Sequence, residues 1–440
     1  MIQFQEALVK VYGQGKKRAS SFLDQSECVP LNESSGRITA EAVHGRETVP
    51  GFDNSSMDGF AVRSEESLGA SPSQPITLGV QETILAGQTP IVVPDTRARR
   101  CYEIMTGAPV PTGFDAIYKV EDIEVILDSE RKLRSIRIAK PIRRFENFRA
   151  RGADFEAGAK LLVANTRLMP EQVMALASVG VSEVRVLRKP KVAVLSTGSE
   201  LVSPEEPSLL PGKIRNSTAS YLQSAIPHFG AEVRYYGTVT DDRSVFIGML
   251  ERILGDRPDV ILTTGAVSKG THDFIPEIIQ GMRAEILFHN VAIRPGKPQL
   301  FAQFPENGPA FFGIPGNPVS TAVGLRFFVN AYLRGLTGLE AERPLTGLLA
   351  KSVEKPNGLL CLFKAHAEIS SRGTRITSLT GQPSFMVSSL IRANAWVELE
   401  KDLDLVQEGS RVAFYPLFPS HYDYSRPFNA SEITDAESCC

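Results

Sequence analysis

One stretch of the chain, residues 189–340, constrains the fold more than any other, because short apolar runs alternate there with segments of helical spacing. The expected strands are 192–195, 231–236, 260–262 and 310–313, and the expected helices are 217–226, 245–254, 273–280 and 317–336. Strands that are apolar throughout and alternate with helices form a parallel sheet covered on both faces. The pattern therefore predicts a doubly wound α/β domain.

The segments around this domain have a different pattern. In residues 46–144, Ile123, Val125 and Leu127 face one way, a polar turn follows at 128–132, and further alternating residues complete a hairpin. We interpret this segment as a β-rich lobe. Residues 341–420 also consist of short alternating runs and predict a small β domain, followed by a polar, acidic tail at 421–440.

The remaining residues, 1–45 and 145–188, are too few to form separate cores and predict one discontinuous domain. We expect a helix around Phe4–Val11, a second short helix after it, and a third helix at 169–179. A chain of 440 residues exceeds the roughly 250–300 residues at which single cores stop growing, so about two to four domains are expected.

Charge and composition exclude several classes of protein. The chain carries 48 basic and 50 acidic side chains, which argues against binding nucleic acid through a basic surface. No apolar run approaches the roughly 18 residues of a membrane span, and the start lacks the apolar block of a signal peptide, so we expect a cytoplasmic protein without a membrane anchor. The five cysteines form no C-x-x-C pairing with histidines, which argues against structural zinc.

Glycine-bearing loops follow three expected strands, at residues 196–200, 263–268 and 313–318. Open α/β sheets bind ligands at the carboxyl ends of their strands. Glycine allows a ligand to approach the backbone, and the helix that follows presents N–H groups to an anion. One such loop would be explained by the need for a tight turn, but three loops that also carry Ser and Thr favour a binding site.

Carboxylates and cations are found near the same strand ends. Glu200, Asp241, Asp242 and Asp273 follow successive strands, and although exposed acids are usually solvated surface, oxygen ligands beside a phosphate site suit Mg²⁺. The turn 294–298 carries two cations, Arg294 and Lys297, on a backbone made rigid by Pro295 and Pro298. It is either a solvated basic turn or a fixed anion clamp. From the residues alone, the sequence predicts a phosphate-handling site with acids and a divalent metal.

Several motifs, in order along the chain, resemble those of the molybdopterin molybdenumtransferase family, whose relatives include the C-terminal domain of gephyrin. The matching motifs are N-S-x-M-D-G-[YF]-A-V at 54–62, I-M-T-G-A-P-x-P at 104–111, N-x-R-x-x-G-x-D-x-x-x-G at 147–158, S-T-G-x-E-L at 196–201, A-I-[KR]-P-G-K-P at 292–298 and P-G-N-P-V-S at 315–320. The resemblance extends from the first helix to about residue 418.

The resemblance implies an elongated, multidomain α/β plus β chain: a discontinuous linker domain (1–45 and 145–188), a β-rich lobe (46–144), a molybdopterin-binding α/β domain (189–340) and a C-terminal β-barrel (341–420). It also implies a homodimer in which the α/β domain of one subunit and the β-rich lobe of the other form the cleft. The implied reaction inserts molybdate into adenylylated molybdopterin with release of AMP and with Mg²⁺ as cofactor. An adenylyltransferase would act upstream and molybdoenzymes downstream.

Site residues implied by the resemblance are carried over position by position. The catalytic residues would be Asp58, Thr106, Arg149, Asp154, Glu200, Asp241 and Asp273. Of these, the metal would be held by Asp58, Glu200, Asp241 and Asp273. The pterin substrate would be held by Gly198, Ser199, Ser217, Gly265, Ser268, Arg294, Lys297, Pro315, Gly316, Asn317 and Pro318.

Four positions depart from the common family pattern, namely Ala266 and Lys269 in the second loop, Thr218 at the start of a helix, and Arg294 where the family frequently has Lys. They keep two alternatives open: a molybdopterin-binding paralogue or gephyrin-like scaffold without transferase activity, and a molybdopterin adenylyltransferase. Every acid of the motifs is present, which favours an active transferase.

Overall fold

The computed structural model describes residues 1–93, 99–128, 133–266 and 274–418. The chain divides into two compact units. Unit 1 comprises residues 1–41, 163–169 and the described part of 184–428, and unit 2 comprises residues 42–162 and 170–183. Within the described residues, no helix combines the length and apolar character needed to cross a membrane.

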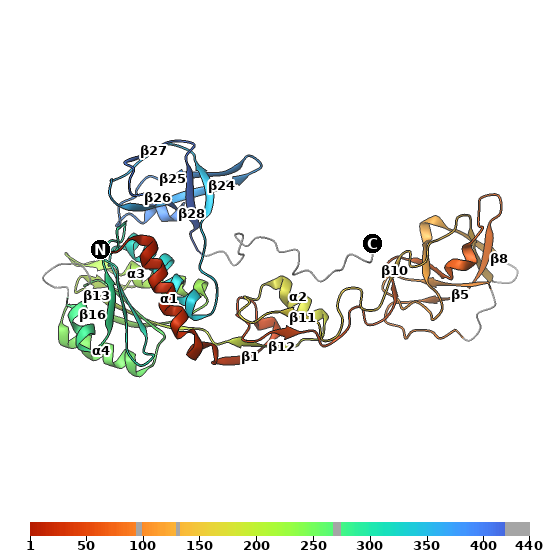
Figure 1. The fold of residues 1–440 in the computed structure, drawn as a ribbon, viewed down its shortest axis with the longest axis horizontal. Coiled ribbons are helices and arrows are strands. Elements are labelled where there is room, and N and C mark those ends of the chain that lie inside the picture. The colour runs from red at the N-terminus through yellow and green to blue at the C-terminus, as the bar shows by residue number, and fades with distance from the viewer. Residues whose placement is uncertain (94–98, 129–132, 267–273, 419–440) are drawn as a thin grey trace. The chain divides into compact units, whose positions relative to one another are not determined.

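Unit 1 contains the α/β domain, which is built on a six-stranded sheet (Figure 1). The strands, in spatial order, are β16 (Glu232–Val239), β13 (Lys191–Thr197), β17 (Val260–Thr264), β21 (Ala310–Ile314), β20 (Leu300–Gln303) and β18 (Glu285–His289). The first four strands are parallel, as the sequence predicts. The last two strands join through antiparallel pairings, β20 with β21 and β18 with β20, which the sequence pattern did not indicate.

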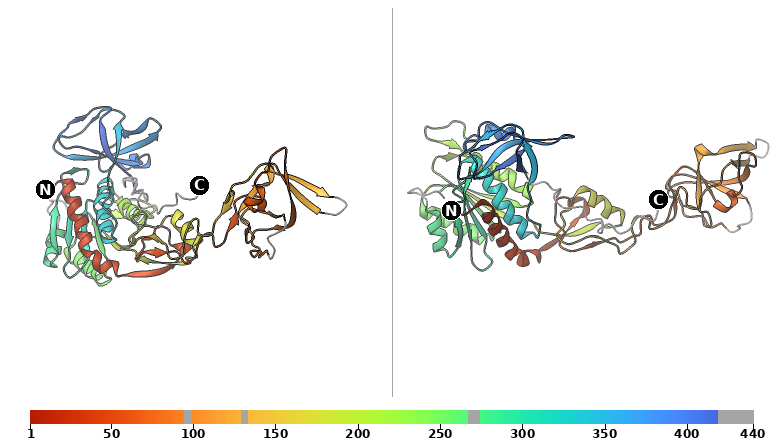
Figure 2. Two further views of the ribbon diagram at one scale, coloured as in Figure 1. Left: turned by 45° about the vertical axis from the view of Figure 1, so that its right-hand side comes forward. Right: turned by 45° about the horizontal axis from the view of Figure 1, so that its top comes forward.

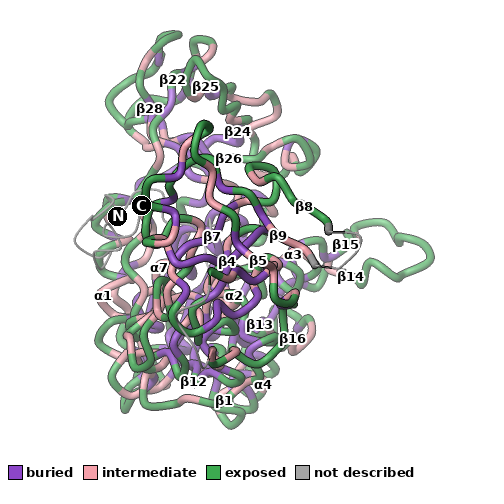
Figure 3. The backbone as a smooth tube through the Cα atoms, turned by 90° about the vertical axis from the view of Figure 1, so that its right-hand side faces the viewer, coloured by how far each residue is buried: buried purple, intermediate pink, exposed green. Residues whose placement is uncertain are grey.

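Helices cover both faces of this sheet. They are α3 (Ser217–Ala225) with the 3₁₀ turn η4 (Ile226–Phe229), α4 (Arg243–Gly255), α5 (Ile275–Gly281) and a C-terminal helical run. Alternate residues of β13 belong to different cores: Val192 and Val194 pack in one cluster, and Ala193 and Leu195 in the other. Both faces are therefore buried, which confirms the doubly wound α/β class. In Figure 3 the tube at β13 is coloured as buried, whereas the segment between β14 (Leu201–Val202) and β15 (Ile214–Arg215) is largely coloured as exposed.

The C-terminal helical run comprises α6 (Pro318–Val323), the π-helix η5 (Gly324–Val329) and α7 (Asn330–Leu336). It begins at Pro318, as expected, because a proline fits the first helical position. Helix α1 (Phe4–Leu23) packs along α7 (Figure 1). The expectation of two short helices at the N-terminus was wrong, because residues 4–23 form one helix. Gly15 does not interrupt this helix but lies inside it, at the point where the backbones of α1 and α7 approach closely.

The C-terminal β domain is a closed barrel, drawn in blue in Figure 2. Its ring consists of β24 (Leu360–Ser370), β25 (Gly373–Ser378), β22 (Leu345–Leu349), β28 (Arg411–Pro416) and β26 (Ala395–Leu399), which pairs again with β24. The 3₁₀ turn η6 (Ser388–Ile391) and the pair β23 (Val353–Glu354) and β27 (Leu405–Val406) complete it. A short strand of the α/β domain, β19 (Ile293–Arg294), pairs with β24 and attaches the barrel.

Unit 2 contains the β-rich lobe, a curled six-stranded sheet. Its order is β7 (Ala116–Lys119), β4 (Gly59–Val62), β6 (Arg100–Ile104), β5 (Ile76–Ile84), β9 (Leu133–Ile138) and β8 (Glu124–Asp128). The antiparallel pairing of β8 with β9 confirms the predicted hairpin. Unit 2 also holds η2 (Ser64–Ser67), η3 (Val120–Asp122), α2 (Pro170–Ser178) and the pairs β3 (Asn54–Ser55) with β10 (Phe148–Arg149) and β2 (Val43–His44) with β11 (Lys160–Leu162).

The remaining short elements lie before the α/β domain. They are β1 (Ser26–Pro30), which pairs with β12 (Glu183–Leu187), and the 3₁₀ turn η1 (Leu31–Glu33).

Candidate active site

The glycine loops lie side by side, because β13, β17 and β21 are neighbours in the sheet. The Thr197 hydroxyl donates to the Thr264 carbonyl at 3.0 Å, and the Gly265 N–H donates to the Ile314 carbonyl at 3.1 Å. Gly265 has φ +92°, and a Cβ there would lie 2.6 Å from Thr197 Oγ1. Gly316 is close to Gly265, since a Cβ on Gly316 would lie 3.8 Å from the Gly265 Cα. The described parts of the three loops therefore lie together at the carboxyl end of the sheet.

Two predicted acids lie at this edge, after the neighbouring strands β13 and β16. The Glu200 carboxylate folds over Gly198, so that a Cβ on Gly198 would lie 2.6 Å from Glu200 Oε2. Asp241 Oδ2 accepts from the Ser199 N–H at 3.5 Å, and both acids are exposed. Two carboxylates therefore lie at one edge of the sheet, and the Lys213 ammonium donates to the Ser199 carbonyl of the same loop at 2.6 Å.

Asp242, which was grouped with these acids, caps helix α4 instead. Its Oδ1 accepts from the Ser244 N–H at 2.8 Å and the Val245 N–H at 3.1 Å. Hydrogen bonds from the Ser244 hydroxyl, the Val245 N–H and the Ser244 N–H hold the pKa of Asp242 below its ordinary value. This aspartate stabilises the helix N-terminus, so it is not a ligand candidate.

The start of α3 contains Ser217, which is exposed, and Thr218, which is buried. The Thr218 hydroxyl donates to Asn216 Oδ1 at 2.9 Å, and the same oxygen accepts from the Ala219 N–H at 3.0 Å. Thr218, which departs from the family pattern, therefore donates a hydrogen bond to the Asn216 side chain that caps the helix.

The Arg294–Pro298 turn lines a cavity of about 480 Å³ together with residues of the third glycine loop. Arg294 and Lys297 are exposed, and Pro315 and Asn317 line the same cavity. Asn317 makes no side-chain capping bond to α6, so its amide is not used by the helix it precedes. The cavity thus brings the two predicted cations together with two residues of the predicted pterin site.

The sequence predicts that the helix after the third loop presents free N–H groups to a ligand. This prediction was wrong for Val319. Pro318 has no N–H, and the Val319 N–H donates to the carbonyl of Ser384, a barrel residue, at 3.0 Å. The barrel thus occupies the first N–H group of α6. Asn317, Ser320 and the clamp turn remain in the cavity lining as polar contacts.

Unit 2 holds the other predicted site residues that the structure describes. Asp58 Oδ1 accepts from the Thr106 N–H at 2.7 Å and from its hydroxyl at 2.8 Å. These bonds, the backbone one first, hold the pKa of Asp58 below its ordinary value, so the carboxylate is ionised at neutral pH. The structure thus joins two residues that are 48 positions apart in the sequence.

Arg149 and Asp154 lie on the return segment of unit 2. Arg149 is opposite Asn54 in the β10–β3 pair, and the Asp154 N–H donates to the Val49 carbonyl at 2.9 Å. Both side chains are exposed. Three further residues of the second loop, Ser268, Lys269 and Asp273, lie outside the described residues.

The donor chemistry at the α/β edge fits a hard divalent cation. Glu200 and Asp241 supply carboxylate oxygens from neighbouring loops, and Mg²⁺ combines one or two protein carboxylates with phosphate oxygens and water. Within the described ranges, no three His, Cys, Asp or Glu side chains come together. A cation at this edge would therefore take its remaining ligands from substrate or from water.

Several cavity residues were missed by the sequence analysis. Ser320 was within a quoted motif but was not selected, and the same is true of Ile293, Pro295, Gly296 and Pro298, whereas the others come from the barrel. The barrel contributes Pro356, Leu359, Phe363, Gln382, Pro383, Ser384 and Phe385. The Gly381-Gln382-Pro383 sequence between two expected strands is a turn signal, but nothing local shows that the turn faces a loop more than sixty residues away.

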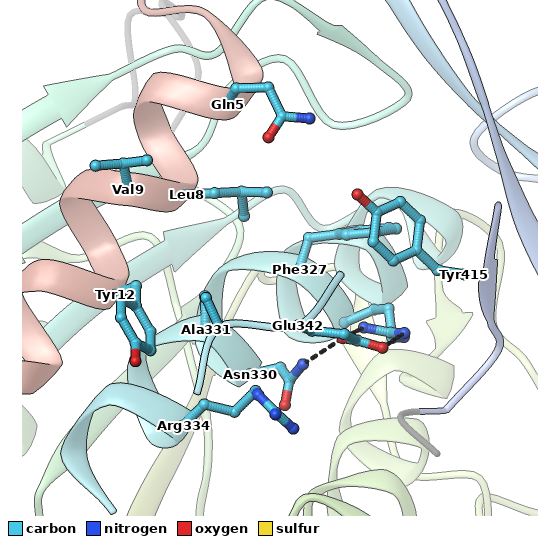
Figure 4. A pocket seen from close by; sticks show the side chains of 12 residues that line it. Gln5, Leu8, Val9, Tyr12, Phe327, Asn330, Ala331, Arg334, Glu342 and Tyr415 are labelled. Carbon is cyan, nitrogen blue, oxygen red and sulfur yellow. Dashed lines mark hydrogen bonds and ion pairs between the residues drawn. The ribbon is translucent and has the colours of Figure 1, made fainter. Parts of the chain in front are cut away.

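A second, smaller cavity of about 180 Å³ lies between α1, the η5–α7 helices and β28 (Figure 4). Leu8, Phe327 and Tyr415 give it apolar walls, and Arg326 forms a bidentate pair with Glu342 at 2.7 Å. None of the predicted site residues that the structure describes lines it. The Arg326 Nε also donates to the Pro416 carbonyl at 3.1 Å, so this region attaches the barrel to the α/β domain.

Comparisons with known proteins agree with this architecture. Three family models match in order: the MoeA N-terminal region (domains I and II) at residues 2–180, a probable molybdopterin-binding domain at 193–335, and the MoeA C-terminal region (domain IV) at 346–417. The molybdopterin molybdenumtransferase of Synechococcus elongatus is 37% identical over 386 residues, covering 88% of this chain and 93% of that relative. The enzyme of the same name from Staphylococcus epidermidis is 34% identical, with 84% and 86% covered.

A solved structure has the same fold over nearly the whole chain. The molybdopterin biosynthesis moeA protein of Pyrococcus horikoshii has a TM-score of 0.77 at 27% identity, covering 94% of this chain and 99% of that one. The fold and the matched models thus define a class of enzyme in molybdenum cofactor biosynthesis, with a molybdopterin-binding type of α/β domain between a β-rich region and a barrel. The chain belongs to the molybdopterin molybdenumtransferase family.

Proposed function

We propose that this protein is a transferase that inserts molybdate into adenylylated molybdopterin and releases AMP. The cavity of about 480 Å³ carries the proposal, because Arg294 and Lys297 lie in it beside the third glycine loop. Two cations in a proline-framed turn can hold the phosphates of the substrate and the molybdate oxyanion. Water would cleave the phosphoanhydride and release AMP, and the two dithiolene sulfurs would bind the molybdenum as one molybdate oxo group leaves as water with the two thiol protons.

Acids of the site have a separate role in this proposal. Glu200 and Asp241 would hold Mg²⁺ at the scissile phosphoanhydride, together with Asp58 and Asp273. When bound, Mg²⁺ neutralises charge on the phosphates and stabilises the leaving AMP. Asp58 is suited to this role because two hydrogen bonds from Thr106 fix its direction and lower its pKa further. Arg149 and Asp154 would contact the molybdate side of the substrate.

AMP release by the purified protein tests this function. With adenylylated molybdopterin, molybdate and Mg²⁺, the wild type should release AMP, and Asp58→Asn should lower the rate roughly 100-fold or more, as expected when a charge-stabilising group is removed. Asp242→Asn is the matched control, because Asp242 caps α4 and should leave the rate near that of the wild type.

Other outcomes would contradict the proposal. Consumption of ATP with unmodified molybdopterin would indicate an adenylyltransferase. Binding of molybdopterin by a wild type that releases no AMP would indicate a paralogue or a scaffold.

We further propose that the active form is a homodimer, in which the β-rich lobe of one copy completes the α/β site of the other. Asp58 and Thr106 would then act on a substrate held by Arg294 and Lys297 of the second copy. The enzyme would work in the cytoplasm, receive its substrate from a molybdopterin adenylyltransferase and supply molybdoenzymes. No nucleic acid or membrane takes part.

A further inference from the structure

The barrel contributes an exposed aromatic side chain to the cavity. Phe385 lines the cavity and is 68% exposed, although it is large and apolar. It belongs to the segment Gln382–Phe385, which lies in the same cavity lining as the Arg294–Pro298 turn. The cavity therefore combines cations that suit an anion with an open aromatic face that suits a flat ring.

A fully buried lysine fixes the ends of this segment. Lys364 on β24 is 0% exposed, and its Nζ donates to the Gly381 carbonyl at 2.6 Å and the Met386 carbonyl at 2.9 Å. These two carbonyls immediately precede and follow Gln382–Phe385. Because hydrogen bonds from a charged donor are stronger than neutral ones, Lys364 holds the backbone of the segment firmly.

Further contacts fix two residues of the segment, Gln382 and Ser384. The Gln382 side chain accepts from the Lys364 N–H at 3.0 Å and donates to the Lys364 carbonyl at 2.9 Å. The Ser384 carbonyl accepts from the Val319 N–H of α6 at 3.0 Å. The segment is thus tied to both the barrel and the α/β domain, and the backbone that carries Phe385 is preorganised for a ligand.

We propose that Phe385 is a stacking residue for the heteroaromatic ring of a phosphorylated substrate, and that Lys364 is the positioning residue that holds it in the cavity. The proposal rests on the proposed function for the class of substrate and adds the contact that recognises its ring. The ring is either the pterin or the adenine of the substrate, because both present a flat π face.

Equilibrium binding to the full-length protein tests this role with three probes: AMP, a phosphorylated pterin and inorganic phosphate. Phe385→Ala should weaken binding of at least one ring-bearing probe roughly five- to one-hundred-fold, as the loss of one stacking contact predicts, and leave phosphate binding unchanged. Phe385→Trp should retain the affinity for the ring-bearing probe. The fluorescence of the introduced tryptophan should change when the ring binds, whereas the signal of the buried Trp396 should stay constant. The probe that loses affinity identifies the ring.

Two further variants serve as positioning test and control. Lys364→Met should weaken ring binding as Phe385→Ala does while phosphate binding persists, a selective effect that general unfolding would not produce. Ile369→Ala removes a 79%-exposed apolar side chain elsewhere on β24 and should change no affinity.

The proposal is overturned if Phe385→Ala binds both ring-bearing probes like the wild type, or if it loses phosphate equally. The same measurements distinguish a failure of the stacking role from a failure of the proposed transferase reaction. Unchanged ring binding in Phe385→Ala with normal AMP release by the wild type rejects only the stacking role. Selective loss of ring binding in Phe385→Ala with a wild type that releases no AMP supports stacking and rejects the reaction.

Discussion

Adjacent aspartates after β16 show how hydrogen-bond partners decide what a side chain can do. Asp242 directs Oδ1 to the first N–H groups of α4 and is used by the helix. Asp241 accepts a hydrogen bond from the Ser199 N–H at 3.5 Å and stays at the sheet edge beside Glu200. The position before the first helical residue, rather than the residue type, therefore separates a cap from a ligand candidate.

The Thr106→Val variant isolates the hydroxyl that holds Asp58. The backbone N–H bond remains, so the pKa of Asp58 should rise but stay below its ordinary value. Because the folded pKa is lowered, this carboxylate stabilises the fold above its unfolded pKa, and the contribution is lost as pH falls through the folded pKa. NMR titration of the carboxyl carbon should show the rise, and the acid limb of AMP release should move to higher pH.

A matched variant in the same lobe controls for general effects. The pKa of Glu103 is held low by Arg134 and, in addition, by the Thr83 hydroxyl. Thr83→Val should therefore raise the pKa of Glu103 and leave that of Asp58 unchanged. An unchanged Asp58 titration in Thr106→Val would reject the role assigned to the hydroxyl.

Among the elements, the contact between α1 and α7 depends on small residues at the crossing. A Cβ on Gly15 would lie 2.3 Å from the Tyr332 carbonyl oxygen, and a Cβ on Gly335 would lie 2.4 Å from the Tyr12 carbonyl oxygen. These obstacles are backbone atoms, which cannot rotate away. The two helices therefore approach as closely as they do only because both positions are glycine.

Gly15→Ala should lower the free energy of unfolding by about 1–3 kcal/mol, because the added methyl group forces the two helices apart. Gly13→Ala is the control in the same helix: a Cβ there meets nothing within 4 Å, so it should raise stability by roughly 0.5–1 kcal/mol. Trp396 packs against Phe327 in this core, and its fluorescence during urea unfolding provides the measurement. Equal shifts in both variants would show that the contact is unimportant.

At the scale of the whole molecule, the sequence predicted the features that local patterns determine. The apolar runs of β13, β17 and β21 and the Asn317-Pro318 helix start gave the parallel sheet and its glycine edge. The second pairing of β24 with β26 and the Ser384–Val319 bond depend on partners distant in the chain. For that reason the barrel wall of the cavity, including Phe385, could not be predicted from periodicity.

The division of site residues between the two units leads to a prediction for mixed subunits. Asp58 lies in unit 2 and Glu200 in unit 1, so the proposed homodimer would build each cleft from one copy of each. Asp58→Asn and Glu200→Gln homodimers should each be inactive. In an equal mixture, half of the dimers are hybrids with one fully native cleft and one doubly substituted cleft, so about one quarter of all clefts are intact.

Mixing after dissociation and reassembly should therefore restore AMP release to about one quarter of the wild-type rate, because one of every four clefts is native. Two variants of the same unit, Glu200→Gln and Asp241→Asn, form the control, since no exchange of copies can give a native cleft when both substitutions affect the α/β edge. Recovery in the first mixture and none in the second would support a cleft shared between copies. If neither mixture recovers although hybrid dimers form, each copy builds its site from its own residues, and the role of Asp58 must be sought within one chain.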